Sequence, residues 1–447
     1  MPDRALTDEE RFPLLDDSGR RMLRRLLEHP HGPAYNNHAG DRLSAEGLAN
    51  VRRYAERLHT GRSGWRHGEL PPWLVELMTF CRREVPFHRR RLDWSDNFFS
   101  LPSTAREDLR REPWAFVPDS AKVSDLIVFG TAGTLGDQLK IPSHPEAAAC
   151  YLPLMETALA ARNVRLQGGD RVSIVQVHAQ GRTFSYASVS SYLHSAGYAK
   201  INLNSADWRD PADRARFLDD CNPELYTGDP IAFAELMKLP LRTRPKALLS
   251  SSATLLPGLR QQLETHFGCP AIDVYSLTES GPVAFARDCG FEILPHDLYV
   301  EILDPDDRPC PPGVRGEVVL SGGHNALLPL LRYRTGDYAT LDFSESIPVL
   351  VALELRQPVL FRDAADRRFN NIDVTFALRE LPLPFFALHQ SADGSLRFCT
   401  RCEEQTLQAA QQALIALFGG LPLKVEMVPE SVAWAGKVIQ YTSDLVG

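Results

Sequence analysis

Short β-rich runs alternate with helical stretches through the middle of the chain, and this alternation restricts the fold more than any other feature. The runs LIVFG and RVSIVQVH are separated by a glycine-rich loop and by an Ala/Leu-rich helix around residues 153–162. The strand KALLSSS, an amphipathic helix over 257–267 and the strand AIDVYS follow, and then a β-rich block over 298–341. This order of elements is typical of an α/β domain.

The two flanks of the α/β region differ from it. Residues 1 to about 120 are dense in Arg, Glu, Leu and Pro and predict a helical lead-in. Towards the other end, the strands PFFALHQ and SLRFCTRC precede the helix EEQTLQAAQQALIALF and the strand LKVEMV. We therefore expect a large N-terminal α/β domain of several sheets over residues 1–355 and a small α+β domain over 356–447.

Charge and composition exclude several classes of function. The chain of 447 residues has 49 Lys and Arg against 57 Asp and Glu, and the net charge of −8 disfavours a protein that coats nucleic acid. The apolar stretch over 147–161 contains Pro153 and Glu156 and is shorter than the about 20 apolar residues that span a membrane. The start, MPDRALTDEERFPLLDD, is acidic where a secretory signal is basic. The 8 Cys lack regular spacing and predict reduced thiols. Together these features indicate a cytoplasmic protein.

Two motifs place polar groups where a β run ends. In VFGTAGTLG, residues 128–136, glycines allow backbone N–H groups to approach an anion and threonines add donors, so a phosphate cradle or an ordinary turn is indicated. The loop matches neither the P-loop nor the dinucleotide pattern. In DVYSLTESG, residues 273–281, a strand ends in hydroxyls and a carboxylate. Such a Glu can hold Mg²⁺ or cap the next turn.

Two further motifs lie nearer the C-terminus. In LRYRTGDY, residues 331–338, Gly336 predicts a turn that presents Asp337, and a carboxylate there can accept both ribose hydroxyls. An ordinary turn Asp is the alternative. In WAGKVIQ, residues 434–440, Lys437 stands alone after a glycine, and a solvated surface lysine is the alternative there.

The order of these motifs makes them specific. The four motifs, with SSAT at 251–254 before the second, resemble the ordered core motifs of adenylate-forming enzymes. Within that superfamily the phenylacetate-CoA ligase family is the most similar, because VPFHRRRL at 85–92 and LPSTAREDL at 101–109 resemble its N-terminal signature. The resemblance covers roughly residues 70–447 and implies a large adenylate-forming domain with a small mobile C-terminal domain.

The resemblance implies a binding site for ATP and Mg²⁺. The residues implied to form the loop over the β- and γ-phosphates are Thr131, Gly133, Thr134 and Gly136. Those implied to lie along or near the adenine are Ser252, Ala253, Tyr275 and Ser276. Thr278 is implied to contact the α-phosphate, Glu279 to bind Mg²⁺, Asp337 to bind the ribose, and Lys437 to bridge the substrate carboxylate and the α-phosphate.

Two more residues have counterparts in related enzymes. His178 follows an apolar strand at a place where relatives often carry an aromatic residue or His beside the acyl pocket, although a core His is equally compatible. Arg362 is the candidate for the hinge Arg that contacts the ribose. Around it the family pattern is largely missing, since Phe361 stands where Gly is expected and Asn370-Asn371 replaces a Gly-containing loop.

The phosphate loop also departs from the family pattern. Leu135 replaces a hydroxyl residue, and Asp137-Gln138 replaces Lys-Pro. An Asp beside a triphosphate repels it unless it points away, which predicts weak ATP binding or a degenerate binder. The soft ligands after the Glu motif, Cys289, His296 and Cys310, lack the spacing of a four-ligand zinc site.

The resemblance implies an AMP-forming acid–thiol ligase. It would adenylate a carboxylic acid, an aromatic one by family likeness, and pass the acyl group to coenzyme A. A phosphopantetheine arm on an acyl or peptidyl carrier protein is the alternative acceptor, and a catalytically degenerate nucleotide-binding protein is the alternative function. We expect no nucleic-acid or membrane partner, and a homodimer stays open.

Overall fold

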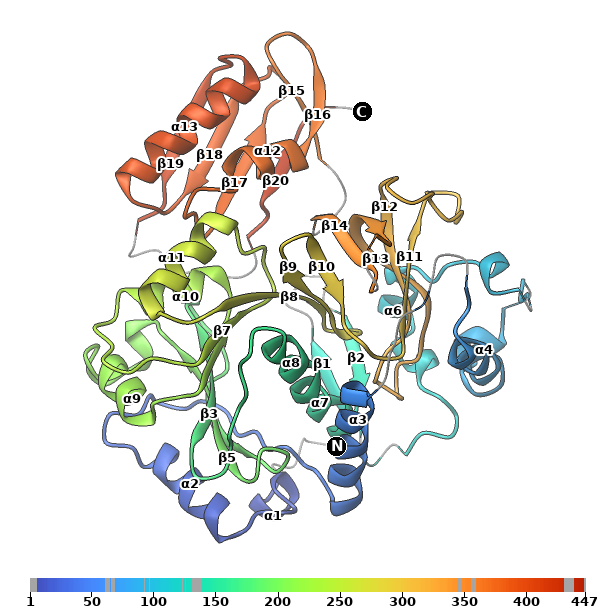
Figure 1. The fold of residues 1–447 in the computed structure, drawn as a ribbon, viewed down its shortest axis with the longest axis vertical. Coiled ribbons are helices and arrows are strands. Elements are labelled where there is room, and N and C mark those ends of the chain that lie inside the picture. Colours follow the sequence, from blue (N-terminus) through green and yellow to red (C-terminus); the bar gives the residue numbers. More distant parts are fainter. Residues whose placement is uncertain are drawn as a thin grey trace.

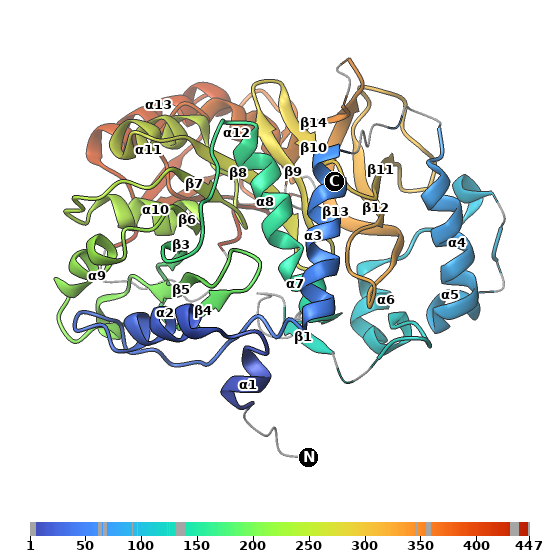
Figure 2. The same ribbon diagram turned by 60° about the horizontal axis from the view of Figure 1, so that its bottom comes forward.

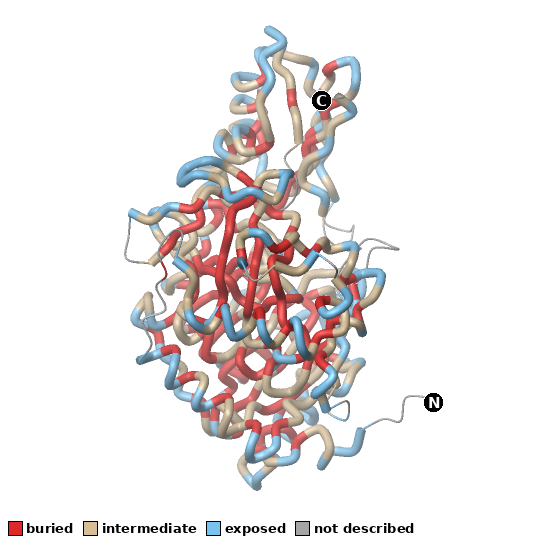
Figure 3. Tube along the Cα trace, turned by 90° about the vertical axis from the view of Figure 1, so that its right-hand side faces the viewer, coloured by how far each residue is buried: buried red, intermediate tan, exposed pale blue. Residues whose placement is uncertain are grey.

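The computed structural model describes residues 6–60, 65, 69–91, 93–95, 97–122, 124, 126–130, 139–344, 347–354, 359–429 and 438–445. These residues form a large body and a smaller C-terminal lobe that stands above it (Figure 1). Buried segments of the chain run through the middle of the body, as Figure 3 shows.

Helices occupy most of the region before the first strand. They are α1 (Asp8–Arg11), α2 (Asp17–Leu27), α3 (Ala45–Thr60), α4 (Pro72–Glu84), α5 (Pro86–Arg89) and α6 (Arg106–Arg111), with the 3-10 turns η1 (Phe98–Ser100) and η2 (Pro113–Phe116). Local sequence sets where they start. Asp16 caps α2 by accepting a hydrogen bond from the backbone N–H of Gly19 at 2.7 Å. Pro72 fills the first position of α4, where the helix needs no N–H donor.

Twelve of the described strands share one hydrogen-bonded order, β11-β12-β13-β14-β10-β9-β8-β7-β6-β3-β5-β4. Their bounds are β3 (Val172–His178), β4 (Tyr186–Ser190), β5 (Ala196–Asn202), β6 (Leu225–Gly228), β7 (Ala247–Ser250), β8 (Ala271–Leu277), β9 (Gly281–Arg287), β10 (Gly290–Ile293), β11 (Leu298–Leu303), β12 (Gly316–Gly322), β13 (Leu330–Asp342) and β14 (Val349–Glu354). Strands β5, β3, β6, β7 and β8 pair in parallel. Parallel strands end at the same edge of a sheet, so the segments after β3, β7 and β8 gather there.

Helices cover both faces of the parallel strands. They are α7 (Pro145–Ala149), α8 (Tyr151–Ala160), α9 (Asp213–Cys221), α10 (Pro230–Met237) and α11 (Pro257–Phe267), and the 3-10 turn η4 is Ser205–Asp207. Because strand side chains alternate, Val175 and Val177 of β3 pack with α2 and α9 to α11, whereas Ile174 packs with α8. On that second face α3 and α8 run side by side (Figure 2).

A separate antiparallel hairpin precedes α7. It consists of β1 (Ile127–Gly130) and β2 (Lys140–Ser143). The glycine-rich segment 131–138 joins these two strands and lies outside the described residues.

The C-terminal lobe is a four-stranded sheet with two helices and a hairpin. Its elements are β15 (Leu360–Arg362), β16 (Arg368–Asn370), α12 (Asn371–Leu378), β17 (Phe386–Gln390), β18 (Leu396–Thr400), α13 (Glu404–Phe418), β19 (Leu423–Met427) and β20 (Tyr441–Ser443), and the sheet order is β19-β18-β17-β20. The sequence predicts β17, β18, α13 and β19. It does not predict α12, whose apolar residues lack a clear one-sided pattern, or the short strand β20.

The lobe contacts the body at the start of α11. Leu256 belongs to the apolar core of the lobe, and the backbone N–H of Gly258 donates to the carbonyl of Arg379 at 2.9 Å. A Cβ on Gly258 would lie 2.2 Å from the carbonyl oxygen of Glu380, so the contact requires glycine.

The fold class predicted from the sequence is confirmed: a mixed α/β body with a large sheet and a small C-terminal α+β unit. Most of the body's strands join one continuous sheet, to which the β1–β2 hairpin is added. Among the described residues, no helix combines the length and apolar character that crossing a membrane requires.

Candidate functional site

The turn between β8 and β9 carries a buried carboxylate. Glu279 is 3% exposed, and its Oε1 accepts hydrogen bonds from Arg106 Nη1 at 2.8 Å and from the Tyr333 hydroxyl at 2.9 Å. Burial, with the Glu279 charge beside it, raises the pKa of Tyr333 well above its usual value. The side chain of Thr278, one residue earlier, is exposed. The turn therefore exposes the Thr278 hydroxyl to solvent, and the carboxylate of the next residue, Glu279, is neutralised by Arg106.

A second carboxylate lies in β13. Asp337 is 8% exposed and follows Gly336, which has a φ of +80°. The sequence predicts a turn here, but the structure shows a β-bulge, because the pairing of β12 with β13 shifts register between Glu317 and Val319 and then continues. Glycine takes this left-handed conformation without strain, so β13 does not end here. The strand kinks at the bulge, which changes the direction of the Asp337 side chain, and then continues.

Tyr275 of β8 bonds to the second of these carboxylates. It is 3% exposed, and its hydroxyl donates to Asp337 Oδ2 at 2.8 Å. Burial raises the pKa of this phenol well above its usual value, and the charges of Asp337 and Glu279 act in the same direction. The structure thus brings together three residues from the predicted set, although their sequence positions span two separate motifs. The place of Tyr275 near an adenine stays a prediction.

The segment after β7 is held by a buried acid. Ser252 takes a φ of +74°, which is uncommon outside glycine, and Ala253 follows it. Asp273 Oδ2 accepts a hydrogen bond from the backbone N–H of Leu255 at 3.1 Å and so holds the end of this segment. Burial raises the pKa of Asp273 to about 7.

Two other predicted residues lie on β8 and β3, which β7 and β6 separate in the sheet. Ser276 of β8 is hydrogen-bonded to the Tyr151 hydroxyl, which α8 supplies. His178 ends β3, and neither of its ring nitrogens has a hydrogen-bond partner in the described part of the chain. Burial, with a smaller effect of the Lys200 charge, lowers the pKa of His178 to about 3, so the ring is neutral near pH 7.

Six of the predicted residues stay untested or lie elsewhere in the fold. Thr131, Gly133, Thr134, Gly136 and Lys437 lie outside the described residues. Arg362 is on β15 in the C-terminal lobe, and its Nη1 donates to Asp366 Oδ1 at 3.2 Å. Its role at the ribose stays a prediction.

The donor chemistry at the β8 edge suits a hard divalent cation. Mg²⁺ takes carboxylate oxygens, commonly one or two from the protein with the rest from phosphates and water. Both described bonds of Glu279 go to Oε1, and the exposed Thr278 adjoins it. A Mg²⁺ ion fits this residue if the cation displaces or joins the Arg106 guanidinium. Within the ranges that the structure describes, no three His, Cys, Asp or Glu side chains gather as a metal site of their own.

A family model described as "AMP-binding enzyme" matches residues 163–327. This segment is an AMP-binding enzyme region. It contains Ser252, Ala253, Tyr275 and Glu279, while Asp337 lies ten residues beyond its end (337 − 327).

The chain is a distant homologue of phenylacetate-coenzyme A ligases. It is 23% identical to the ligase of Thermus thermophilus over 296 residues and 33% identical to that of Escherichia coli over 285 residues. These matches cover 60% and 58% of this chain, and 64% and 63% of the two ligases, which is less than two thirds of their length.

The fold is that of adenylate-forming enzymes. A crystal structure of 2-hydroxyisobutyryl-CoA ligase in the postadenylation state superposes with a TM-score of 0.61 at 17% identity, covering 85% of this chain and 95% of that one. At this identity the likeness concerns the fold alone.

Two residues around the AMP-binding region were missed by reasoning from the sequence. Arg106 lies 173 positions before its partner Glu279, and the signal that could have found it is its place in the signature stretch LPSTAREDL. Tyr333 stands in the same motif as Asp337, but nothing local shows that its hydroxyl reaches Glu279. Both contacts depend on how β13 and α6 pack against the β8–β9 turn.

Proposed function

We propose that this chain is an ATP- and Mg²⁺-dependent ligase that adenylates a carboxylic acid and passes the acyl group to a thiol. The observation that carries the proposal is the cluster of Glu279, Tyr275 and Asp337 at the edge of the AMP-binding region. The two carboxylates have different partners and so suit different ligands. Asp337, oriented by a phenol, would accept the ribose hydroxyls, and Glu279 would hold Mg²⁺.

The reaction would have two steps. In the first, an oxygen of the acid's carboxylate attacks the α-phosphorus of ATP, the bond to the β-phosphate breaks, and acyl-AMP and pyrophosphate form. In the second, a thiolate attacks the acyl carbon, the C–O bond to AMP breaks, and the thiol proton passes to solvent. Negative charge develops at phosphorus in the first step, and positive charge placed beforehand lowers that barrier.

The chain's own residues would hold the reactants. Thr278, exposed at the end of β8, would donate to the α-phosphate, and Lys437 would bridge the carboxylate and the α-phosphate. Mg²⁺ on Glu279 would supply further positive charge at the phosphates. His178 is neutral near pH 7, and its ring nitrogens have no hydrogen-bond partner among the described residues, so it would face the acid as a hydrogen-bonding group instead of a charge.

The relatives suggest the substrates. The phenylacetate-coenzyme A ligases support an aromatic acid and coenzyme A. A carrier-protein phosphopantetheine thiol has the same chemistry as coenzyme A, and the choice between them is an outcome of the test.

The test is pyrophosphate release with ATP and Mg²⁺ over a panel of aryl and aliphatic acids, with hydroxylamine as the acyl acceptor. We expect acid-dependent release that is greatest for an aryl acid, and subsequent thioester formation with coenzyme A. Lys437→Ala should lower the rate at least a hundredfold while ATP still binds, because the lysine's charge acts in the transition state. Lys424→Ala is the matched control, since this lysine is 75% exposed on β19 and pairs only with Glu426 among the described groups.

A second candidate is a nucleotide-binding protein without turnover. The observation in its favour is the Arg106 guanidinium on Glu279, which occupies an oxygen that Mg²⁺ would use. If no acid of the panel gave pyrophosphate release while calorimetry still showed ATP binding, this candidate would be established and the proposed ligase activity would be refuted.

A further inference from the structure

A half-buried lysine lies next to His178 on the sheet. Lys200 is on β5, and the parallel register places it opposite Gln176 of β3, two residues before His178. Side chains two residues apart along a strand point to the same side, so Gln176 and His178 share the face of β3 that Ile174 turns toward α8. Lys200 lies on this face too, because it is directly opposite Gln176.

The ammonium of Lys200 has no counter-charge in the described part of the chain. None of the carboxylates there pairs with it, and no hydrogen-bond acceptor is found for it. Burial lowers the pKa of Lys200. Beside the larger effect of burial, the Lys200 charge lowers the pKa of His178, so the two groups lie within electrostatic range of each other. A cation removed from water without a partner is costly, and a ligand that supplies an anion would offset that cost.

The side chains around Lys200 add hydrogen-bond donors. The Tyr198 hydroxyl donates to Gln176 Oε1 at 2.5 Å and so holds the amide, while Gln176 Nε2 has no acceptor among the described groups. Tyr186, opposite Lys200 on β4, stacks on the Tyr198 ring with the centroids 6.0 Å apart. Lys200 is therefore flanked by an amide with N–H groups to offer and by aromatic rings.

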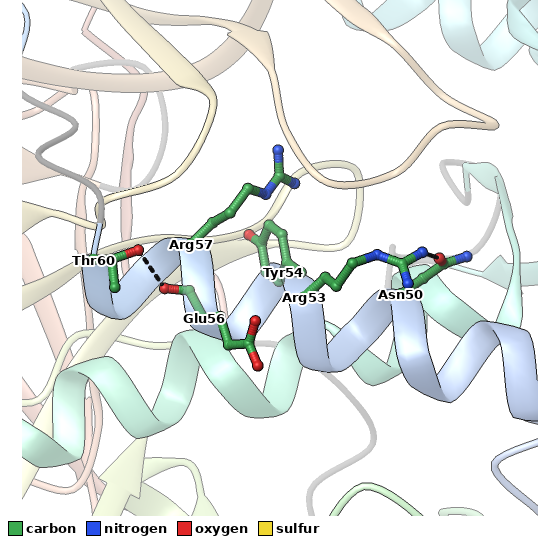
Figure 4. Close-up of a pocket in the computed structure, with 6 residues that line it drawn as sticks. All are labelled: Asn50, Arg53, Tyr54, Glu56, Arg57 and Thr60. Carbon is green, nitrogen blue, oxygen red and sulfur yellow. Dashed lines mark hydrogen bonds between the residues drawn. The ribbon is translucent and has the colours of Figure 1, made fainter.

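Arginines on the same side of the sheet are satisfied differently. They lie on α3 around a hollow of about 610 Å³, which Figure 4 shows. Arg53 donates to the Asn50 amide oxygen, and Arg57 Nη1 lies 3.8 Å from Asp297 Oδ2. The Arg57 side chain is also 70% exposed, so water solvates it. Lys200, by contrast, has neither a described acceptor nor full access to water.

The proposed reaction fixes which way the acid lies. Thr278 and Glu279 follow the end of β8, and β3 ends at the same edge because the strands from β3 to β8 pair in parallel. The reacting carboxylate must meet the α-phosphate at this edge. The rest of an acid that contacts His178 then extends back along the sheet towards Lys200. One two-residue step along a strand is about 6.6 Å, a span that a substituted aryl ring can bridge.

We propose that Lys200, together with Gln176, binds a second anionic group at the far end of the acid, so that the substrate is a dianionic aryl acid. The inference rests on the proposed function, because the direction of the acid is taken from the ligase reaction. The ammonium supplies the charge, and the amide supplies a further donor. Hydrogen bonds to ionised groups are about twice as strong as neutral ones, so this pair would select an anion over a neutral substituent. Lys200 determines specificity and does not touch the reacting carboxylate.

The test uses two matched series, the 4-methyl, 4-hydroxy and 4-carboxy derivatives of benzoate and of phenylacetate. The readouts are kcat/KM for pyrophosphate release and the Kd of each acid by calorimetry. In the unaltered chain the 4-carboxy acid of the better series should exceed its 4-methyl counterpart about tenfold or more in kcat/KM. This comparison needs no variant, so it decides the matter if a substitution at Lys200 prevents folding.

Lys200→Met removes the charge and keeps most of the side-chain length. It should lower kcat/KM for the 4-carboxy acid about thirtyfold and leave the value for the 4-methyl acid and the KM for ATP within about threefold. Lys238→Met is the matched control, because it removes the same charge at the end of α10, which packs on the opposite face of the sheet. That variant should change none of these values.

Lys200→Glu gives a readout that a purely structural role would not produce. The reversed charge should abolish the preference for the 4-carboxy acid and favour the 4-aminomethyl acid instead. Three results would overturn the inference: a 4-methyl or 4-hydroxy acid that equals or exceeds the 4-carboxy acid in the unaltered chain, an equal loss for the 4-methyl and 4-carboxy acids in Lys200→Met, or an equal effect of Lys238→Met.

The failure of the ligase and the failure of this inference can be told apart. If no acid gives pyrophosphate release, the proposed ligase activity fails, and calorimetry of the acids still tests Lys200. Tighter binding of the 4-carboxy acid that Lys200→Met weakens about thirtyfold would then support the anion site. Absence of that preference in binding would overturn it.

Discussion

Replacing Arg106 by methionine tests the electrostatics at the β8–β9 turn. The substitution keeps most of the side-chain length but removes the charge that bonds Glu279 at 2.8 Å. Loss of a hydrogen bond to a charged group costs about 1.5–3 kcal/mol, and loss of one partner of a fully buried ion pair costs about 3–5 kcal/mol. The side chain of Glu279 is 2% exposed but that of Arg106 is 37% exposed, so water screens the pair. The bond to Tyr333 also remains. We therefore expect a loss of about 1.5 kcal/mol.

The assay is the thermal midpoint with and without Mg²⁺. In a chain of 447 residues a loss of this size should lower the midpoint by about 1–2 °C. Millimolar Mg²⁺ should recover most of the shift in Arg106→Met, because the cation can take the place of the guanidinium on Glu279, and should have less effect on the unaltered chain. In turnover assays the Mg²⁺ concentration for half-maximal rate should fall.

Arg110→Met is the control for this prediction. Arg110 lies on the same helix, α6, and pairs with Glu107 at the surface, so its replacement should leave the midpoint and the Mg²⁺ response unchanged. An Arg106 variant with the same midpoint as the unaltered chain, or with no added response to Mg²⁺, would refute the reasoning that the arginine neutralises Glu279.

Three other substitutions test separate contacts. Tyr275→Phe removes the donor to Asp337 and should raise the KM for ATP about tenfold in steady-state kinetics. Asp273→Asn removes an acid whose pKa rises from 3.8 to about 7 on folding. The folded state binds this proton more tightly, so the acid's contribution to stability falls as the pH rises from about 4 to about 7, by at most about 1.4 kcal/mol per pH unit. The Asn variant should lack that slope in denaturant titrations. Gly258→Ala drives a Cβ against the Glu380 carbonyl and should cost about 1–3 kcal/mol and increase the radius of gyration in X-ray scattering.

Each of these three substitutions has a control or a result that would contradict it. Tyr226→Phe removes a buried hydroxyl that has no partner in the described part of the chain, and it should leave ATP binding unchanged. Gln261→Ala alters an exposed position of α11, so an equal scattering change in that variant would contradict the packing argument for Gly258. A stability difference between Asp273→Asn and the unaltered chain that does not vary with pH would contradict the assigned pKa.

Much of the fold follows from local sequence. The short β-rich runs predict β3 and β8, and the apolar face and the closing Gly419–Gly420 predict α13. These signals are local, since a strand or an amphipathic helix can be recognised from the pattern of about ten consecutive residues. The bulge at Gly336 could not be predicted in this way, because a glycine before a polar residue also fits a turn. Only the pairing of β13 with both β12 and β14 makes it a bulge.

The sequence by itself determined which residues could carry the chemistry: the hydroxyls and Glu279 at the end of one strand, Asp337 after a glycine, and Lys437 near the C-terminus. The tertiary structure decided which groups these residues meet. Arg106 reaches Glu279 across 173 positions, and Tyr275 reaches Asp337 across 62. Such contacts depend on strand order and helix placement. No local pattern encodes them, because they arise only when distant elements bury their apolar faces against one another.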